Sequence, residues 1–233
     1  MTEAAPGDDH GTLYVVATPI GNLEDVTLRA LRILGSVDLI AAEDTRHTRK
    51  LLTHHGISCP LLSYHDHNKA PQAQRLLGLL QEGRRIALVT DAGTPGIADP
   101  AYHLLQVLLP HGIPVVPIPG PSAAIAALSV SGLPMNRFVF EGFLPLKSGR
   151  RRQRLEALRE DPRTVVLYES PHRFLKLLRE LVEHFGAERR VVVARELTKY
   201  YEEIARGTAA SLLERWQERS VRGEFTVIVD GRP

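Results

Sequence analysis

The sequence predicts two α/β domains, the first built on a mostly parallel sheet. Apolar runs rich in Val, Ile, Leu and Ala alternate with longer segments of helical periodicity, which is the pattern of βαβ units. The runs lack alternating polar residues, as expected for strands that helices cover on both faces. Proline and glycine are then concentrated at residues 117–121, and we place the domain boundary there.

The elements of the first domain, residues 12–118, follow from these patterns. Gly56 and Gly83 stand where helices are expected to end, since glycine readily adopts the conformation that follows a helix. Asp99 and Pro100 suit the N-cap and first position of a further helix. Strands are expected at 13–17, 37–42, 60–64, 86–90 and 113–118, and helices at 26–34, 45–55, 70–82 and from Asp99 to just before Gly112.

The second domain, residues 119–233, shows the same alternation. Its helices are expected at 122–131, 148–160, 174–185 and 209–219, and its strands at 137–143, 164–169, 190–196 and 224–230. Residues 1–11 are polar and acidic and lack the apolar core of a signal peptide, so a short disordered tail is expected there.

Composition limits the class of protein. Hydrophobic residues make up 43% and charged residues 24% of the chain, as in ordinary globular proteins. The single cysteine, Cys59, excludes an internal disulfide framework and fits a reducing compartment. No segment approaches the roughly 20 apolar residues of a membrane-spanning helix, so we expect a cytoplasmic protein with no membrane partner. The net charge of +2 does not by itself predict nucleic-acid binding.

Two loops at expected strand ends carry residues suited to a ligand site. In open α/β sheets ligands bind beyond the carboxyl ends of the strands, where Glu43-Asp44-Thr45-Arg46 and residues 91–96 are expected. Glu43 and Asp44 alternatively cap the following helix. The second loop is long for a plain connection, and its glycines let the backbone approach a ligand closely. Neither a G-x-G-x-x-G motif nor a Walker A loop is present.

Two further motifs each permit two interpretations. Ser122-Ala123-Ala124 is expected to open a helix with small residues. Either the free backbone N–H groups at this helix start contact a polar ligand, or the small side chains simply permit close helix packing. His65-Asp66-His67 contains metal-ligand residue types, but no helical H-x-x-x-H or E-x-x-H pair accompanies it. We interpret it as a polar loop that lines a cleft, and no metal is expected.

Basic residues are concentrated in two places, just after the strand expected at 137–143 and just after Glu43-Asp44. Such clusters are usually solvated faces, and they also suit RNA phosphates. Few aromatic residues accompany them, so base stacking is not strongly indicated. The clusters are Lys147, Arg150, Arg151, Arg152 and Arg154, and Arg46, Arg49 and Lys50. From the residues alone, the prediction is a two-domain α/β protein with a ligand cleft, and the ligand stays open.

Several ordered segments together resemble the 16S rRNA (cytidine-2′-O)-methyltransferase I branch of the tetrapyrrole methylase superfamily. They extend over most of the chain, in the family's order. The segments are ATPIGNL (17–23), AEDTRHT (42–48), HDHN (65–68), DAGTP (91–95), PGPSAA (119–124), EGFLP (141–145), YESPHR (168–173), ARELTK (194–199) and GEF (223–225).

The resemblance implies two α/β domains of the tetrapyrrole methylase type, with S-adenosylmethionine in the cleft between them, and a homodimer. It implies methylation of a cytidine ribose 2′-hydroxyl in the decoding region of 16S rRNA, within the small ribosomal subunit. The donor-binding residues that it implies are Ile20, Asp91, Ile97, Ala98, Ser122, Ala123, Tyr168 and Ala194.

A ribose hydroxyl is a poor nucleophile, so a base or hydrogen-bond acceptor is expected near it. The catalytic candidates are Glu43, Asp44 and Glu169, and the RNA-binding candidates are Arg46, Lys147, Arg150, Arg151 and Arg152. Two other classes stay open. A tetrapyrrole C-methyltransferase shares the fold but has no use for the Arg-rich loop, and a non-catalytic RNA-binding protein would not need an intact loop at Asp91.

Overall fold

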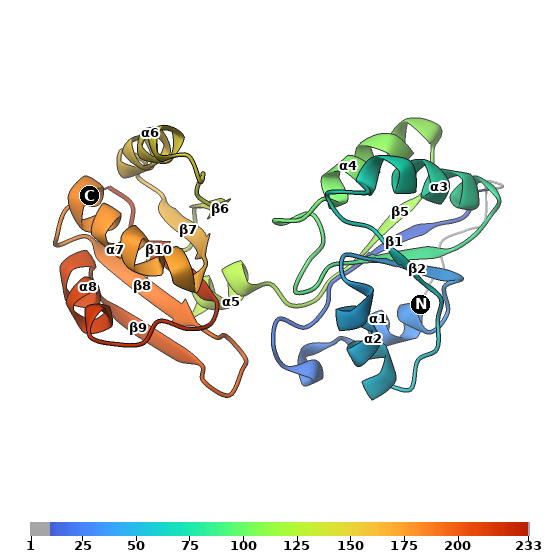
Figure 1. Ribbon diagram of the computed structural model, residues 1–233, viewed down its shortest axis with the longest axis horizontal. Helices are drawn as coiled ribbons and strands as arrows, with labels where there is room; N and C mark the ends of the chain where they lie inside the picture. Colours follow the sequence, from blue (N-terminus) through green and yellow to red (C-terminus); the bar gives the residue numbers. More distant parts are fainter. Residues whose placement is uncertain (1–9, 233) are drawn as a thin grey trace. The chain divides into compact units, whose positions relative to one another are not determined.

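The protein consists of two compact units, which meet in the sequence after Pro121 (Figure 1). The computed structural model describes residues 10–232. Both units are α/β, which confirms the predicted fold class. Most of the expected tail, residues 1–9, lies outside the described residues. Gly11, also expected in the tail, is buried, and its amide donates to the Leu80 carbonyl oxygen at 2.7 Å.

The first unit contains one sheet of five strands in the order β3-β2-β4-β1-β5, and every pairing in it is parallel. Ala42 at the end of β2 lies opposite Val89 at the end of β4. The loops that follow these two strands therefore begin side by side at one edge of the sheet. The strands are β1 (Leu13–Val16), β2 (Leu39–Ala42), β3 (Leu61–Ser63), β4 (Ile86–Val89) and β5 (Val115–Ile118).

Helices cover both faces of this sheet, as the unbroken apolar strands predict (Figure 1). One face packs against α3 (Lys69–Gln81) and α4 (Ala101–Leu108), and the other against α1 (Leu28–Leu34) and α2 (Thr45–His54). Two short 3-10 helices, η1 (Leu23–Asp25) and η2 (Leu109–His111), complete the unit. Helix α4 begins one residue later than expected, with Pro100 as its N-cap, although the Asp99 carboxylate still accepts the Ala101 amide at 3.0 Å as a capping Asp does.

The second unit contains a mixed sheet in the order β6-β7-β10-β8-β9, in which only the β6–β7 pair is parallel. The sequence patterns missed β9, which pairs antiparallel with β8 along its whole length. The strands are β6 (Phe138–Phe143), β7 (Thr164–Glu169), β8 (Arg190–Arg195), β9 (Glu203–Thr208) and β10 (Phe225–Val229).

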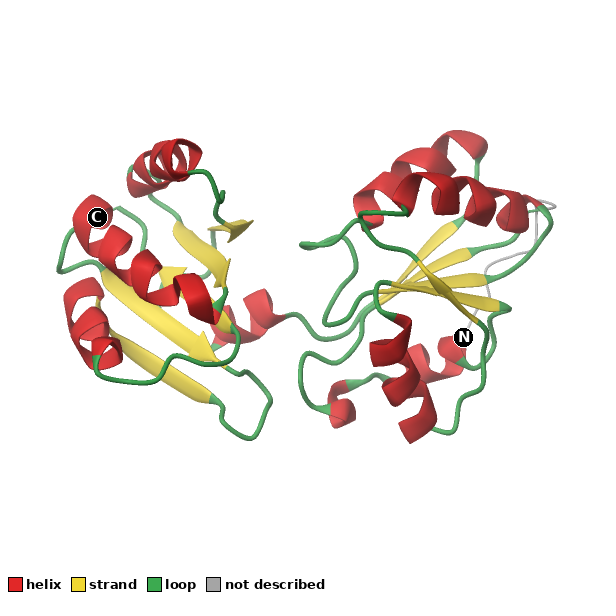
Figure 2. Cartoon of the chain, viewed as in Figure 1, coloured by secondary structure: helices red, strands yellow, loops and turns green. Residues whose placement is uncertain are grey.

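The helices of the second unit divide unequally between the two faces of its sheet, as Figure 2 shows in red against yellow. The short α5 (Ala123–Ser129) packs on one face, and α6 (Ser148–Arg159), α7 (Pro171–Phe185) and α8 (Ala209–Gln217) cover the other. Phe174 and Phe225 stack with ring centroids 3.9 Å apart, and Trp216 meets both edge-on. Among the described helices, none has the length and apolar character needed to cross a membrane.

Candidate active site

A pair of carboxylates lies at the edge where β2 and β4 end. The Thr90 hydroxyl donates to Glu43 Oε2 at 2.6 Å, and the Asp91 amide donates to the same oxygen at 3.4 Å. Asp91 Oδ1 in turn accepts the Asp44 amide at 3.0 Å. Two loops that are far apart in the sequence thus form one hydrogen-bonded group, because the strands before them are neighbours.

The environment of Asp91 disfavours its charge. Partial burial raises the pKa of this carboxyl above its ordinary value, and the negative charge of Glu43 raises it further. The Asp44 amide opposes this shift by donating a hydrogen bond. Asp91 is therefore held close to a second acid, at a position that the fold leaves partly open to solvent.

Asp44 is the N-cap residue of α2. Its carboxylate accepts the Arg46 amide at 2.8 Å and pairs with the Arg46 guanidinium at 2.7 Å. The hydrogen bonds from Arg46 hold the pKa of Asp44 well below its usual range. A carboxylate that is so stabilised in its charged form accepts a proton poorly, so Asp44 is a weak candidate for a general base.

The loop after Asp91 is folded tightly back onto the end of β1. Thr18 and Gly93 exchange two backbone hydrogen bonds of 2.9 and 3.0 Å. Gly93 has φ +81°, and a Cβ added there would touch Ile20 at 3.5 Å. Ile20 is buried beside this bridge, whereas Ile97 and Ala98, further along the loop, are exposed. Of the four donor-binding candidates in this unit, the structure brings Ile20 and Asp91 together around Gly93.

In the second unit, the donor-binding candidates meet at the start of α5. Tyr168 and Ala194 flank Thr226 in the register of β7, β10 and β8, so the three form one row across the sheet. The Ala124 amide donates to the Tyr168 hydroxyl at 3.1 Å, next to Ser122 and Ala123. Burial raises the pKa of Tyr168. Thr226, which directly follows the GEF segment and was not among the candidates, is the buried residue between Tyr168 and Ala194.

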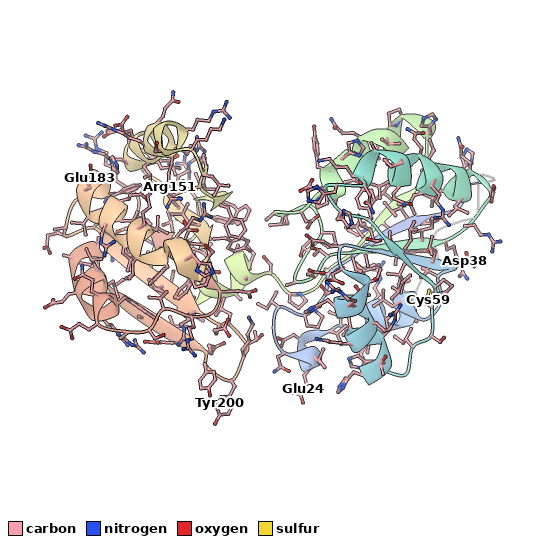
Figure 3. The ribbon with its side chains drawn as sticks, in the orientation of Figure 1. Glu24, Asp38, Cys59, Arg151, Glu183 and Tyr200 are labelled. Atoms are coloured by element: carbon pink, nitrogen blue, oxygen red, sulfur yellow. The ribbon has the colours of Figure 1, made fainter. Side chains whose placement is uncertain are left out.

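Glu169 and Arg151 correct two of the predictions. Glu169 is fully buried and pairs with Arg173 at 2.7 Å and with Arg151 at 3.1 Å. The Arg151 side chain is only 2% exposed and also pairs with Glu180 of α7 at 2.8 Å. In Figure 3, Arg151 lies beneath α6, inside the second unit. The Arg151 guanidinium is therefore turned away from the surface expected to bind RNA, and the Glu169 carboxylate is enclosed in ion pairs and not open to a substrate.

The other residues of that cluster stay on the surface. Lys147 and Arg150 are exposed, and Arg152 pairs with Glu156 one helical turn away, with its side chain 73% exposed. Arg154 pairs with Glu141. The cluster is thus a basic surface on α6 with one of its members turned inward.

A second basic surface lies on α2. Arg49 and Lys50 lie three and four positions after Arg46, so the three basic residues share one helix face. Together with η1 they line an open groove of about 600 Å³, formed by Leu23, Arg46, Arg49, Lys50, Thr53 and His54. Arg46 lines this groove with a side chain that is 85% exposed even though it pairs with Asp44.

His65-Asp66-His67 forms a turn before α3. The Asn68 side chain accepts the His65 amide at 2.8 Å, and Asp66 pairs with Lys69 at 2.8 Å. The two imidazole rings stand 5.9 Å apart, edge to face. Within residues 10–232, no group of three or more His, Cys, Asp or Glu side chains is arranged to hold a metal ion.

Comparison with known proteins identifies the family. Residues 12–213 match the family model described as Tetrapyrrole (Corrin/Porphyrin) Methylases. The ribosomal RNA small subunit methyltransferase I of Synechocystis sp. is 53% identical over 221 residues, which are 95% of this chain and 79% of that protein. The protein of the same name from Escherichia coli O157:H7 is 54% identical, over 96% of this chain and 79% of that one.

The chain belongs to the ribosomal RNA small subunit methyltransferase I family, within the tetrapyrrole methylases. This confirms the family predicted from the ordered segments. Solved structures share the fold at low sequence identity. A cobalt precorrin-4 methyltransferase matches with a TM-score of 0.70 at 18% identity, over 98% of both chains. A uroporphyrin-III C-methyltransferase from Thermus thermophilus, in complex with S-adenosylhomocysteine, matches with a TM-score of 0.67 at 20% identity, over 94% of this chain and 97% of that one.

The buried ion pairs of Arg151 predict a large loss of stability when this side chain is removed. Arg151→Ala leaves the buried Glu169 with Arg173 alone and Glu180 with only the exposed Lys176 at 3.8 Å. Breaking a buried ion pair in this way costs up to about 3–5 kcal/mol. Arg152→Ala, one residue along the same helix, removes only an exposed pair and should cost less than about 1 kcal/mol. Urea unfolding of both variants measures the difference, and equal stabilities would contradict the structural role of Arg151.

Asp91→Asn should stabilise the fold near neutral pH. Because the folded-state pKa of Asp91 is raised, its ionisation disfavours the folded state, and the deficit is complete above that pKa. Asparagine keeps an acceptor for the Asp44 amide and removes the charge. We expect a higher melting temperature at pH 7 and a gain that shrinks as the pH falls toward about 4, the ordinary pKa of Asp.

The matched control is Asp66→Asn, because Lys69 lowers the pKa of Asp66 and its ionisation favours the fold. This variant should show no gain at pH 7. An Asp91→Asn protein that melts at a lower temperature than the parent at pH 7 would mean that the charge of Asp91 supports the fold.

Proposed function

We propose that this chain transfers a methyl group from S-adenosylmethionine to the ribose 2′-hydroxyl of a cytidine in the decoding region of 16S rRNA. The observation that carries the proposal is an identity of about half over 95% of the chain to proteins named ribosomal RNA small subunit methyltransferase I. The ordered segments that resemble the cytidine-2′-O branch support the finer assignment. We further propose a cytoplasmic homodimer that acts on the assembled small subunit.

The residues of the site suit this donor. At Gly120 an added Cβ would lie 2.9 Å from the Ala17 Cβ, so the backbone approaches the end of β1 as only glycine permits. The side chains assigned to the donor are mostly small or apolar, and Asp91 is the carboxylate among them. We assign donor binding to Ile20, Asp91, Ile97, Ala98, Ser122, Ala123, Tyr168 and Ala194.

When bound, the donor supplies a methyl group activated by a positively charged sulfur. That charge disappears during transfer, so a carboxylate held directly against the sulfur would stabilise the starting state and slow the step. Asp91 is better used as an acceptor for the donor's polar N–H or O–H groups. The other residues assigned to the donor would orient it for an in-line displacement. Alignment of the methyl carbon with the attacking oxygen lowers the barrier of such a step.

Glu43 is the proposed proton acceptor. In the transfer a carbon–oxygen bond forms, the carbon–sulfur bond breaks, and the ribose hydroxyl releases its proton. Of the three catalytic candidates, Asp44 is held by Arg46 and Glu169 lies between two arginines. Glu43 is only partly buried, and the Thr90 hydroxyl orients its carboxylate. It is therefore the candidate that is not held in an arginine ion pair, and we assign it as the base.

RNA binding is assigned to the two basic surfaces. Lys147, Arg150 and Arg152 present cations from the start of α6, and Arg46 does so from the groove on α2. Phosphate contacts of this kind hold RNA without reading its sequence. The choice of nucleotide then depends on other residues.

Transfer of a labelled methyl group tests the proposal as a whole. Purified protein with labelled S-adenosylmethionine should label the RNA of small subunits that lack the modification, also in the presence of a chelator. Labelling of a porphyrinoid instead would identify a tetrapyrrole C-methyltransferase. Donor binding without transfer to either acceptor would contradict the proposed reaction.

Glu43→Gln should slow methyl transfer without weakening donor binding. A general base contributes roughly 10²–10⁴-fold to a rate, so we expect kcat to fall by about 100-fold. Calorimetry should give an unchanged Kd for the donor. The exposed Glu24 offers a control, since Glu24→Gln should leave both values unchanged. If the Glu43→Gln protein keeps the kcat of the parent, Glu43 is not the base.

The combined variant Lys147→Ala, Arg150→Ala and Arg152→Ala should weaken RNA binding and its dependence on salt. Each lost phosphate contact lowers the slope of log affinity against log salt by about 0.7 on single-stranded RNA. Arg159→Ala, at the other end of α6, is the matched control and should keep the slope. If the combined variant also keeps the slope, this surface is only a solvated helix face.

A further inference from the structure

Two adjacent tyrosines stand in solvent at the end of the hairpin between β8 and β9. Tyr200 is 92% exposed and Tyr201 is 67% exposed. Their ring centroids are 4.9 Å apart at an interplanar angle of 89°, so one ring meets the other edge to face. In Figure 3, Tyr200 lies at the outer end of this loop. Aromatic rings are normally largely buried, so two adjacent exposed rings indicate a binding surface.

The backbone that carries these rings is strained. Glu196 has φ +50° and Thr198 has φ +66°, a region that L-residues rarely adopt. For Thr198 the conformation is especially unfavourable because its side chain is β-branched. Such strain persists only where surrounding contacts enforce it, and it is found preferentially at functional sites.

A network of hydrogen bonds enforces the conformation. Glu196 accepts the Lys199 ammonium and the Glu224 amide, each at 2.9 Å. Glu202 accepts the Thr198 amide at 2.6 Å. At Gly223 an added Cβ would lie 2.5 Å from the Glu196 side chain, so the neighbouring loop leaves space for this arrangement. The tyrosines are therefore presented by a fixed loop.

The lysine next to the rings is occupied by ion pairs, so any binding here depends on the rings themselves. Lys199 also pairs with Glu224 at 2.9 Å, so its ammonium is shared between two carboxylates and is not free for a phosphate. The two rings thus offer flat, uncharged surfaces. We propose that Tyr200 and Tyr201 form a stacking platform for unpaired bases of the RNA, next to the β8 strand that carries Ala194.

The proposal rests on the proposed function, because it assumes an RNA substrate. A second copy of the chain is a less suitable occupant. A stable protein interface buries about 800 Å² on each partner and has an apolar centre, whereas the residues on either side of the tyrosines, Lys199 and Glu202, are charged. Stacking on an aromatic ring, in contrast, needs only one exposed face for each base.

Binding of single-stranded RNA tests the platform. The probes are an oligonucleotide of about twelve nucleotides, within the range of known single-strand sites, and an abasic one of equal length and charge. We expect Tyr200→Ala with Tyr201→Ala to weaken binding of the first probe about tenfold and to leave binding of the abasic probe unchanged. The slope of log affinity against log salt concentration should also be unchanged, because no phosphate contact is lost.

Conservative variants separate stacking from packing. Replacement of both tyrosines by Phe should preserve affinity, whereas replacement by Leu, which is apolar but cannot stack, should lose it. Equal affinity of the parent and the double Ala variant for the oligonucleotide would overturn the platform. So would a dimer in the parent that dissociates in the double Ala variant while RNA affinity stays the same.

Failure of the platform and failure of the proposed function give different results. If the parent protein transfers no methyl group to small-subunit RNA, the proposed function fails, although a loss of oligonucleotide binding in the double Ala variant still supports the platform. If the parent transfers the methyl group and the double Ala variant binds RNA equally well, only the platform fails.

Discussion

The crowding of Glu43 against Asp91 is the interaction from which the chemistry of the first unit follows. Parallel pairing of β2 and β4 places the ends of these strands together, so two acidic loops that are 47 residues apart share the hydrogen bonds of Thr90 and Asp44. Burial and the charge of Glu43 raise the pKa of Asp91. A fold optimised for stability alone would avoid this repulsion, and perturbed carboxylates of this kind are concentrated at functional sites.

The second unit uses its charges in the opposite way. Arg151 is withdrawn from a basic surface to neutralise Glu169 and Glu180, which joins α6 and α7 to the end of β7. Tyr168, the residue before Glu169 on β7, accepts a hydrogen bond from the Ala124 amide at the start of α5. The helix proposed to hold RNA and the strand proposed to hold the donor are therefore connected through one buried ion-pair network. Breaking it should disturb both activities through the fold.

Most of the fold could be predicted from periodicity, and much of the site from strand ends. The strand β9 could not, because Glu203, Arg206 and Gly207 interrupt any apolar pattern and its position at the sheet edge requires no such pattern. The burial of Arg151 was also hidden, since its partners lie 18 and 29 residues away and only the packed structure brings them near. The exposed tyrosines gave no signal because solvent exposure and positive φ angles are properties of the folded loop.

The position of the transferred methyl group tests the central claim most directly. Small subunits from cells that lack this protein are incubated with the purified chain and S-adenosylmethionine, and the RNA is then digested and mapped by mass spectrometry. The expected product is a single 2′-O-methylcytidine in the decoding region of 16S rRNA. A methyl group on a base, on another nucleotide outside that region, or on no nucleotide at all would contradict the assignment.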